Sequence, residues 1–355
     1  MSIWRWADHW HSPPLEARLS LGEGDTPLIR SRYIGPTAGL RNLFFKLETA
    51  NPTSSYKDRF AAAAISHMRA HGEQTCIATS SGNTGAALAA YCAAAKIRCR
   101  IAIVDTAPEA KLQQMLAYGA EIFRVKGFGT QPESTRQSFE ALKTLGKRPG
   151  HKLQISAFTH SPKGMAGVES IGLELAEQAE QEIKHIFSPA GGGGLTLAVV
   201  RSFTKTNQSP AIHCAQPEGN NTIAGPLRDG SISAQDARCS TDISGLQVAT
   251  VIDGNEVIQK CRSTGGTGHL VSDAEVWATQ KMMSREEGIF SEPAGAVALA
   301  AALKATANGE IDTEATIICL VTGSGFKDVS SIDRLNEDVD CPLIEPDEII
   351  SHCAG

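Results

Sequence analysis

The chain has 355 residues, which at about 150 residues per domain predicts two domains with a large buried core and excludes a disordered protein. Its 33 lysine and arginine residues against 39 aspartate and glutamate residues give a net charge of −6, which excludes the basic surface that nucleic-acid binding requires. Hydrophobic residues are 41% of the chain but aromatic residues only 5%, which favours helices packed on mostly parallel sheets over a β-sandwich.

The amino-terminal stretch MSIWRWADHWHSPP lacks the continuous apolar region of a signal peptide, and no segment reaches the ~20 apolar residues that cross a bilayer. Its three tryptophans, Trp4, Trp6 and Trp10, predict a segment packed on the body of the protein or on a second subunit, and we expect a homodimer. The nine cysteines are scattered, without a CxxC pair or a zinc-ligand spacing. We therefore expect free thiols, no metal and a reducing cytoplasm.

Strand-like and helix-like segments alternate from about residue 43, which is the pattern of an α/β protein with mostly parallel sheets. The predicted strands lie at 42–48, 75–79, 98–105 and 120–125, and further units of strand, loop and helix begin at 185 and 316. No low-complexity linker divides the chain, so we expect a compact boundary between the domains. We predict a smaller domain at 46–155 and a larger one made of 1–45 and 156–355.

The segment NPTSSYKDR at 51–59 is the first with chemical potential, because Lys57 follows a serine-rich turn at the first turn of a predicted helix. A lysine there lies beside the positive end of the helix dipole, which favours a free amine that can act as nucleophile or base. Taken alone, this segment is a weak signal, because lysines near helix starts are common and usually solvated. We expect Asp58 and Arg59 to position the start of this helix and not to act chemically.

Two further turns lie between a predicted strand and a predicted helix, where backbone N–H groups converge on an anion. The first is SSGNTG at 80–85, which either binds a carboxylate or is an ordinary turn. The second is SPAGGGGLTL at 188–197, where four of the 33 glycines are consecutive. Backbone amides without side chains can surround a phosphate. Because the loop is neither GxGxxG nor a Walker loop, it predicts a monophosphate and disfavours a dinucleotide or ATP.

An amine, an anion-binding turn and a phosphate-binding loop are together what pyridoxal 5′-phosphate requires, since its aldehyde needs a lysine and its phosphate needs amides. The segment VTGSGFKD at 321–328 adds a hydroxyl group, from Thr322 or else Ser324, for the pyridine nitrogen. A hydroxyl group does not hold that nitrogen protonated as a carboxylate would. The sequence therefore favours elimination or replacement over transamination.

Nearly the whole chain, from GDTPL at 24–28 to TGSGFKD, resembles the fold type II pyridoxal-phosphate enzymes, the tryptophan synthase β-like superfamily, and within it the threonine synthases. The resemblance implies two three-layer α/β domains with the cofactor in the cleft between them. It assigns the Schiff base to Lys57, the phenolic oxygen of the cofactor to Asn83, the ring nitrogen to Thr322, the phosphate to Gly191, Gly192, Gly193 and Gly194, and the substrate carboxylate to Ser80, Ser81 and Thr84.

The lysine motif departs from the family pattern at two positions. Ser54 replaces the usual glycine and Tyr56 the usual phenylalanine, and we expect both to leave the chemistry intact while altering the turn. In threonine synthases an asparagine and an arginine help to hold the phosphate of the substrate. Phe158 and Gly164 stand at those positions, with Lys163 one position away as a substitute.

The expected activity is a threonine synthase-like elimination or replacement that converts O-phosphohomoserine into threonine and phosphate, and FSEPAGAVALAAAL at 290–303 favours this. The GGGGL loop instead resembles dehydratases, so a serine or threonine dehydratase is an alternative, as is a synthase of the cysteine or cysteate type that uses an O-activated serine. Weaker candidates for contact with the substrate are Lys111, toward an anionic group, and His160, toward the leaving group. A cofactor-binding scaffold and a nucleotide-binding protein are less favoured.

Overall fold

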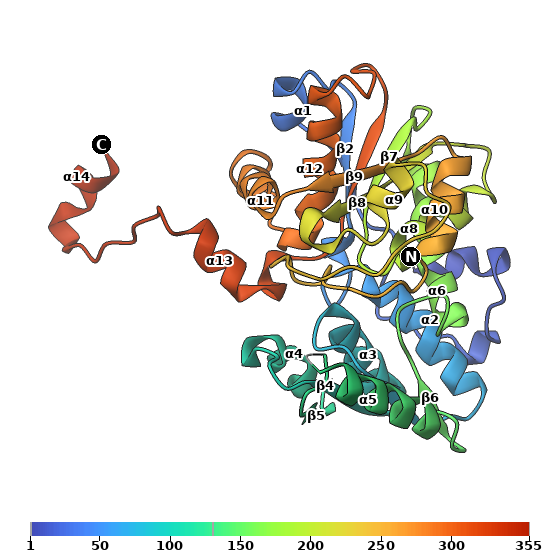
Figure 1. Cartoon of the computed structure of the whole chain (residues 1–355). Coiled ribbons are helices and arrows are strands. Elements are labelled where there is room, and N and C mark those ends of the chain that lie inside the picture. Colours follow the sequence, from blue (N-terminus) through green and yellow to red (C-terminus); the bar gives the residue numbers. More distant parts are fainter. Residues whose placement is uncertain (1, 130, 355) are drawn as a thin grey trace.

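The structure, a computed structural model, describes residues 2–129 and 131–354 (Figure 1). Within these residues the strands form two sheets, one of six strands and one of four. The order in the larger sheet is β1 (Leu28–Arg30), β2 (Leu43–Leu47), β10 (Ile317–Val321), β7 (His185–Pro189), β8 (Ala211–Pro217) and β9 (Gly268–Val271). The order in the smaller sheet is β5 (Glu121–Val125), β4 (Arg98–Val104), β3 (Thr75–Ala78) and β6 (His151–Leu153).

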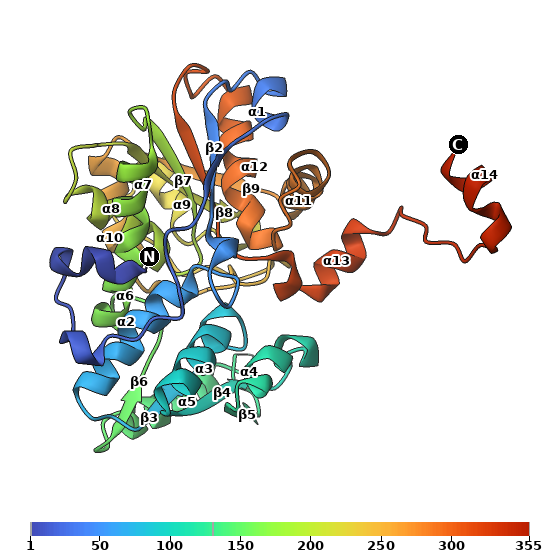
Figure 2. The same cartoon turned by 180° about the vertical axis from the view of Figure 1, so that it is seen from behind.

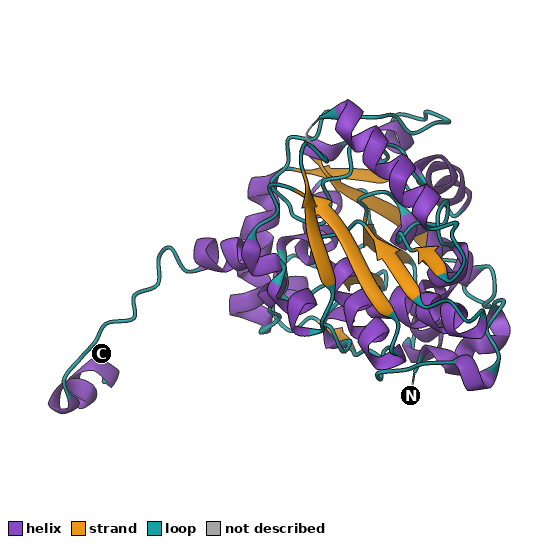
Figure 3. Ribbon diagram, turned by 90° about the horizontal axis from the view of Figure 1, so that it is seen from below, coloured by secondary structure: helices purple, strands orange, loops and turns teal. Residues whose placement is uncertain are grey.

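All pairs of neighbouring strands are parallel except β1 and β2, so the predicted α/β class with mostly parallel sheets is confirmed. Figure 3 shows the strands of the larger sheet with helices on both sides. The helices packed with this sheet and between the two sheets are α1 (Ile34–Thr37), α2 (Lys57–Ala70), α6 (Pro162–Met165), α7 (Ser170–Gln178), α8 (Gly194–Phe203), α9 (Ala224–Arg228), α10 (Gly254–Ser263), α11 (Asp273–Glu287) and α12 (Pro293–Ala307). The smaller sheet carries α3 (Asn83–Ala95), α4 (Gln113–Ala117) and α5 (Pro132–Leu145).

Alanine-rich helices explain the close packing of these layers. Helix α12 has the sequence PAGAVALAAALKATA, with proline at its first position and a buried face made mostly of alanine. Alanine has the highest helix propensity and lets a helix approach a sheet closely, while proline is tolerated only where its missing N–H is not needed. Helix α3 has the same character, and its buried side chains join those of α2 in one core.

A buried ionic network fixes the start of α2 to the larger sheet. The guanidinium group of Arg59 donates hydrogen bonds of 2.7 and 2.8 Å to both Glu48 and Glu174. Lys46 in β2 donates to Glu174 at 2.9 Å. Arg59 and Lys46 are fully buried, and a buried arginine is tolerated when carboxylates occupy its donors, so these pairs hold α2 in one orientation. As expected, Arg59 has a structural role.

The two ends of the chain differ in how they pack. The amino-terminal 3-10 helix at 3–9 lies on the body, where Trp4 Nε1 donates to the carbonyl of Leu19 at 2.8 Å and Ile3 is buried. Beyond α13 (Val329–Leu335) the chain leaves the body and ends in α14 (Ile349–Cys353), as Figures 1 and 2 show. No helix of the described residues is long and apolar enough to cross a membrane. The expected homodimer stays a prediction.

The predicted division of the chain also stays a prediction. The strands of the smaller sheet all fall within 46–155, whereas β2 continues pairing in the larger sheet as far as Leu47. All nine cysteines are unpaired.

Candidate active site

The site lies where the carboxyl ends of parallel strands from both sheets meet, which is the edge at which open α/β sheets bind ligands. Asn83 begins α3 shortly after β3, Gly194 begins α8 after β7, and Thr322 directly follows β10. Lys57 is the first residue of α2. Four segments that are far apart in the sequence therefore contribute to one cleft.

Lys57 is held by two hydroxyl groups. Its Nζ donates a hydrogen bond to Tyr56 Oη at 2.5 Å and one to Ser156 Oγ at 3.0 Å. The same nitrogen lies 4.3 Å from the centre of the Tyr56 ring. No carboxylate of the described residues forms an ion pair with this amine. Sequence reasoning missed Ser156, although a serine just after β6, at the carboxyl edge of the smaller sheet, is a signal that could have found it.

The turn before Lys57 is bound to the loop that follows β10. The backbone N–H of Tyr56 donates to the carbonyl of Thr322 at 3.1 Å, and the N–H of Ser324 donates to the carbonyl of Ser54 at 3.0 Å. Ser54 has a φ of 66°, in the left-handed region that favours glycine. This explains why the lysine motif of the family that the chain resembles has glycine at this position. The turn thus brings Thr322 beside the lysine.

The glycine loop leaves its amides free for an anion. Gly193 has a φ of 94°, and a Cβ on it would lie 2.8 Å from the side chain of Val257, so no other residue fits there without strain. Within the described residues, no backbone carbonyl accepts a hydrogen bond from the N–H groups of Gly191, Gly192 or Gly193. Asp253 fixes the loop by donating its N–H to the carbonyl of Gly192 at 3.1 Å.

The SSGNTG turn has the tight geometry of an anion-binding helix start. A Cβ on Gly85 would lie 2.1 Å from the carbonyl oxygen of Ser80, so only glycine allows this approach. Ser80 and Ser81 are half-buried and Thr84 is buried in the first turn of α3. The first-turn N–H groups of α3 therefore lie beside these hydroxyl groups, an arrangement suited to a carboxylate.

Glu292 is a further site residue that sequence reasoning missed. Both of its carboxylate oxygens accept hydrogen bonds from Asn83 Nδ2, at 2.8 and 3.1 Å. A Cβ on Gly323 would lie 2.4 Å from Glu292 Oε1, so the carboxyl group lies between Asn83 and the Thr322 loop. Burial raises its pKa to about 7. The signal was ambiguous, since an acidic residue before Pro293 normally caps a helix, yet this side chain makes no capping hydrogen bond.

Lys163 does not substitute for the missing arginine, contrary to the expectation. Its side chain is exposed, and it acts on His67, whose pKa is lowered to about 4 chiefly by burial and secondarily by the charge of Lys163. His67 lies ten residues along α2 from Lys57, or about 15 Å at 1.5 Å per residue. The side chain of Lys163 therefore faces the far end of that helix.

Position 164 is closed to any larger side chain. A Cβ on Gly164 would lie 2.6 Å from the ring of Phe60 and 3.0 Å from the side chain of Ala64, both in α2. Phe158, which stands where the asparagine is expected, is buried beneath the guanidinium group of Arg201 at 4.0 Å from its ring centre. Neither position 158 nor position 164 therefore supplies the polar side chain that threonine synthases have there.

The two weaker candidates have different surroundings. Lys111 is partly buried, and its Nζ donates to Ser244 Oγ at 2.5 Å and lies 3.6 Å from Asp328 Oδ2. It therefore connects the loop after β4 with loops of the larger sheet. His160 is exposed, and its pKa is lowered by partial burial and by the charge of Lys143.

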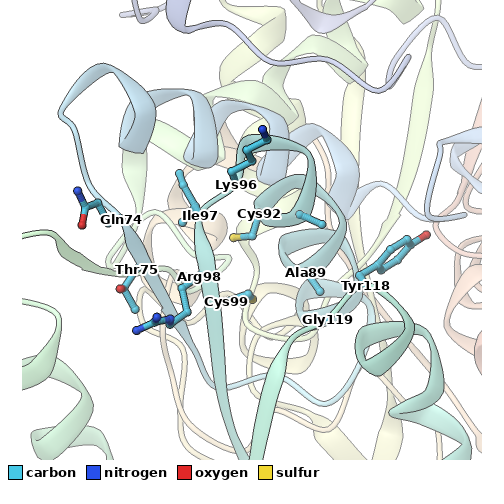
Figure 4. A pocket seen from close by; sticks show the side chains of 11 residues that line it. Gln74, Thr75, Ala89, Cys92, Lys96, Ile97, Arg98, Cys99, Tyr118 and Gly119 are labelled. Atoms are coloured by element: carbon cyan, nitrogen blue, oxygen red, sulfur yellow. The ribbon is translucent and has the colours of Figure 1, made fainter.

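The residues of this cleft fit pyridoxal 5′-phosphate. An amine between two hydroxyl groups, three unpaired glycine amides at a helix start and a threonine at a strand end supply the lysine, phosphate and ring-nitrogen contacts that the cofactor needs. A separate hollow of about 610 Å³ lies at the opposite, amino ends of β3 and β4 (Figure 4). Thr75, Arg98, Cys92 and Cys99 are among the residues that line it, and Lys57 is not.

Comparisons with known proteins agree with this assignment. The sequence model of the family described as "Pyridoxal-phosphate dependent enzyme" matches residues 19–323. Threonine synthase from Methanocaldococcus jannaschii is 27% identical and covers 97% of this chain and 85% of its own. Threonine synthase from Halalkalibacterium halodurans is 28% identical, with 95% and 92% covered.

Solved structures show the same fold. The processed form of threonine deaminase isoform 2 from Solanum lycopersicum matches with a TM-score of 0.74 at 23% identity, covering 88% of this chain and 82% of that one. Serine racemase from Dictyostelium discoideum matches with a TM-score of 0.68 at 25% identity, covering 85% and 92%. The chain is thus an enzyme that belongs to the family of pyridoxal-phosphate dependent enzymes.

Proposed function

We propose that the enzyme catalyses elimination or replacement on an amino acid, and that its leading reaction converts O-phosphohomoserine into threonine and phosphate. The observation that carries this proposal is the placement of the Lys57 amine between Tyr56 and Ser156. Ser156 also adjoins the glycine loop, since a Cβ on Gly194 would lie 3.4 Å from its carbonyl oxygen. The base and the phosphate site are therefore neighbours.

Lys57 would hold the cofactor through its amine, and as a free amine it would be the base that takes the proton from Cα of the substrate. Asn83 would contact the phenolic oxygen of the cofactor, Gly191–Gly194 would hold its phosphate, and Thr322 would contact its ring nitrogen. When bound, the cofactor supplies an electron sink for the negative charge that develops at Cα. A threonine at the ring nitrogen supports elimination and replacement in preference to transamination.

The SSGNTG turn binds the carboxylate of the substrate. Ser80, Ser81 and Thr84 offer hydroxyl groups, and the first-turn amides of α3 add N–H donors and the positive end of the helix dipole. These contacts orient the amino acid so that its Cα proton faces Lys57. They recognise any amino acid and so do not choose among leaving groups.

Lys111 is the cation that we assign to the distal phosphate of the substrate. It is partly buried beside Ser244, whose hydroxyl group can donate to the same anion. Its Nζ is 3.6 Å from Asp328, so the ammonium is only loosely paired. This assignment replaces Lys163, which points away from the cleft.

A serine or threonine dehydratase is the second candidate, and the closure of position 164 favours it. Phe60 and Ala64 fill the space in front of Gly164, so an arginine side chain does not fit at this position. The phosphate of O-phosphohomoserine therefore has no arginine partner there. A small hydroxyl amino acid needs no such group. A replacement synthase that acts on an O-activated serine is compatible with the same cleft.

A panel of amino acids distinguishes these reactions. The purified enzyme is incubated with O-phosphohomoserine, threonine, serine, O-phosphoserine and O-acetylserine, each with and without sulfide or sulfite. Threonine and phosphate from O-phosphohomoserine are the expected products. A keto acid and ammonia from threonine or serine would instead select the dehydratase, and a sulfur-containing amino acid would select the replacement synthase. We also propose that the enzyme is cytoplasmic and that it is a homodimer. Sedimentation of the purified protein tests the homodimer.

A further inference from the structure

Tyr56 stands where the resembling motif has phenylalanine, and the structure gives its phenol a partner. Oη accepts a hydrogen bond of 2.5 Å from Lys57 Nζ. The expectation that this substitution leaves the chemistry intact therefore overlooks a direct contact with the reacting amine. We propose that Tyr56 is a positioning residue, whose hydroxyl group, together with that of Ser156, aims the amine of Lys57 at the reacting carbon. This inference rests on the proposed role of Lys57.

The geometry of the nitrogen makes this role specific. A lysine amine that is free of the cofactor has three bonding directions besides Cε. The hydroxyl oxygens of Tyr56 and Ser156 occupy two of them, at 2.5 and 3.0 Å. Only one direction remains, and it serves as the lone pair that takes the proton or as the N–H that returns it. A phenylalanine at position 56 would leave two directions open and the amine free to rotate.

The phenol is itself held in place. The ring of Tyr56 packs against the buried core formed by α2 and its neighbours, and the backbone N–H of Tyr56 donates to the carbonyl of Thr322 at 3.1 Å. Its backbone has ordinary helical angles, with φ of −60° and ψ of −14°. No strain opposes either tyrosine or phenylalanine at this position, so the substitution Tyr56→Phe removes the hydroxyl group and leaves the fold unchanged.

The proton count of the step is simple. As Lys57 acts, the C–H bond at Cα breaks, a third N–H bond forms on Nζ, and the electron pair stays with Cα. The ammonium group then donates to Tyr56 and Ser156, while its third hydrogen faces the carbon that it left. Return of that hydrogen restores the neutral amine. The phenol keeps its own proton throughout and needs no co-reactant.

Exchange of the Cα hydrogen with solvent tests this role. The holoenzyme is incubated in D₂O with L-2-aminobutyrate or L-alanine, which have no leaving group, and loss of the Cα proton signal is followed by NMR. We expect Tyr56→Phe to slow exchange by about 10- to 100-fold, the effect of losing one hydrogen bond to a charged group. The amino-acid concentration that gives half the maximal exchange rate should change by less than about threefold, because Tyr56 does not bind the substrate carboxylate.

Matched variants separate positioning from general damage. Tyr33 is exposed, so Tyr33→Phe removes a phenol elsewhere and should leave exchange unchanged. Ser156→Ala should slow exchange as Tyr56→Phe does, and the double variant should be slower than either. The cofactor absorbance at saturation should be the same in Tyr56→Phe as in the wild type.

The inference and the proposed function fail in different ways. Exchange by Tyr56→Phe within twofold of the wild type, or a loss of bound cofactor in that variant, would overturn the positioning role and leave the proposed function standing. A wild-type holoenzyme that exchanges neither amino acid would contradict the role of Lys57 as base. That result would remove both proposals.

Discussion

Replacement of Glu292 by glutamine should stabilise the protein relative to the wild type at alkaline pH and change its stability little at acidic pH. Burial raises the pKa of this carboxyl group from its ordinary value of 4.5 to about 7. A raised pKa in the folded state means that the unfolded chain ionises first, so stability falls as the pH rises from about 4.5 to about 7. At 1.36 kcal/mol per pH unit, the difference corresponds to about 3 kcal/mol above about pH 7.

This figure already contains the attraction of Lys327 and Lys111 for the ionised carboxylate and the repulsion of Asp328. A neutral glutamine experiences neither. Glutamine keeps an oxygen that accepts from Asn83, so the contact with Nδ2 is retained. We therefore expect Glu292→Gln to gain about 1–3 kcal/mol relative to the wild type at about pH 8, and little at about pH 4.

Urea unfolding of the cofactor-free protein at about pH 4 and about pH 8 measures this difference. Glu180 is exposed, so Glu180→Gln is the control and should shift the unfolding midpoint by the same small amount at both pH values. A stability difference for Glu292→Gln that does not depend on pH would refute the reasoning. So would a loss of stability that is greater at about pH 8.

Three further variants test the cleft. Gly193→Ala would place a Cβ 2.8 Å from Val257 at a φ of 94°, and it should weaken cofactor binding at least about tenfold. Fluorescence titration with the cofactor measures this, and an unchanged affinity would contradict the assignment of this loop to the phosphate. Ser54→Gly should raise the free energy of unfolding by about 0.5 kcal/mol, because the strain removed from a serine in the left-handed region slightly exceeds the cost of the greater backbone entropy of glycine in the unfolded chain. Urea titration measures this, and a destabilised variant would show that the turn is not strained. Lys111→Ala should raise KM for O-phosphohomoserine about tenfold and change KM for serine little in steady-state assays, whereas equal effects on both substrates would contradict its assignment to the distal phosphate.

Local sequence determined more of the site than of its surroundings. The positions of Lys57, the SSGNTG turn and the glycine loop at the starts of helices were predictable, because turn residues and the flanking strand and helix patterns mark such junctions locally. Their roles toward the cofactor stay predictions. The mostly parallel sheets followed from the alternation of strands and helices. The positive φ at Ser54 explains why the family motif has glycine there, and nothing in the structure explains the serine.

The residues that sequence reasoning missed come from tertiary contacts. Ser156 reaches Lys57 across ninety-nine positions, and Glu292 reaches Asn83 across two hundred and nine. No local pattern encodes such pairs. Lys163 shows the converse, because its place in the sequence pointed to the cleft while the packing of Gly164 against Phe60 turned the lysine outward. The direction in which the helix points its side chains, and not proximity in the sequence, determines where the Lys163 amine lies.

Chemical fixation of the cofactor tests the central claim most directly. The holoenzyme is treated with borohydride, which makes the bond between pyridoxal 5′-phosphate and its lysine permanent, then digested and analysed by mass spectrometry. We predict one modified peptide, with the cofactor on Lys57, and none from the Lys57→Ala variant. Modification of Lys111 or Lys327 in place of Lys57, or no modified peptide from the wild type, would contradict the assignment of this cleft.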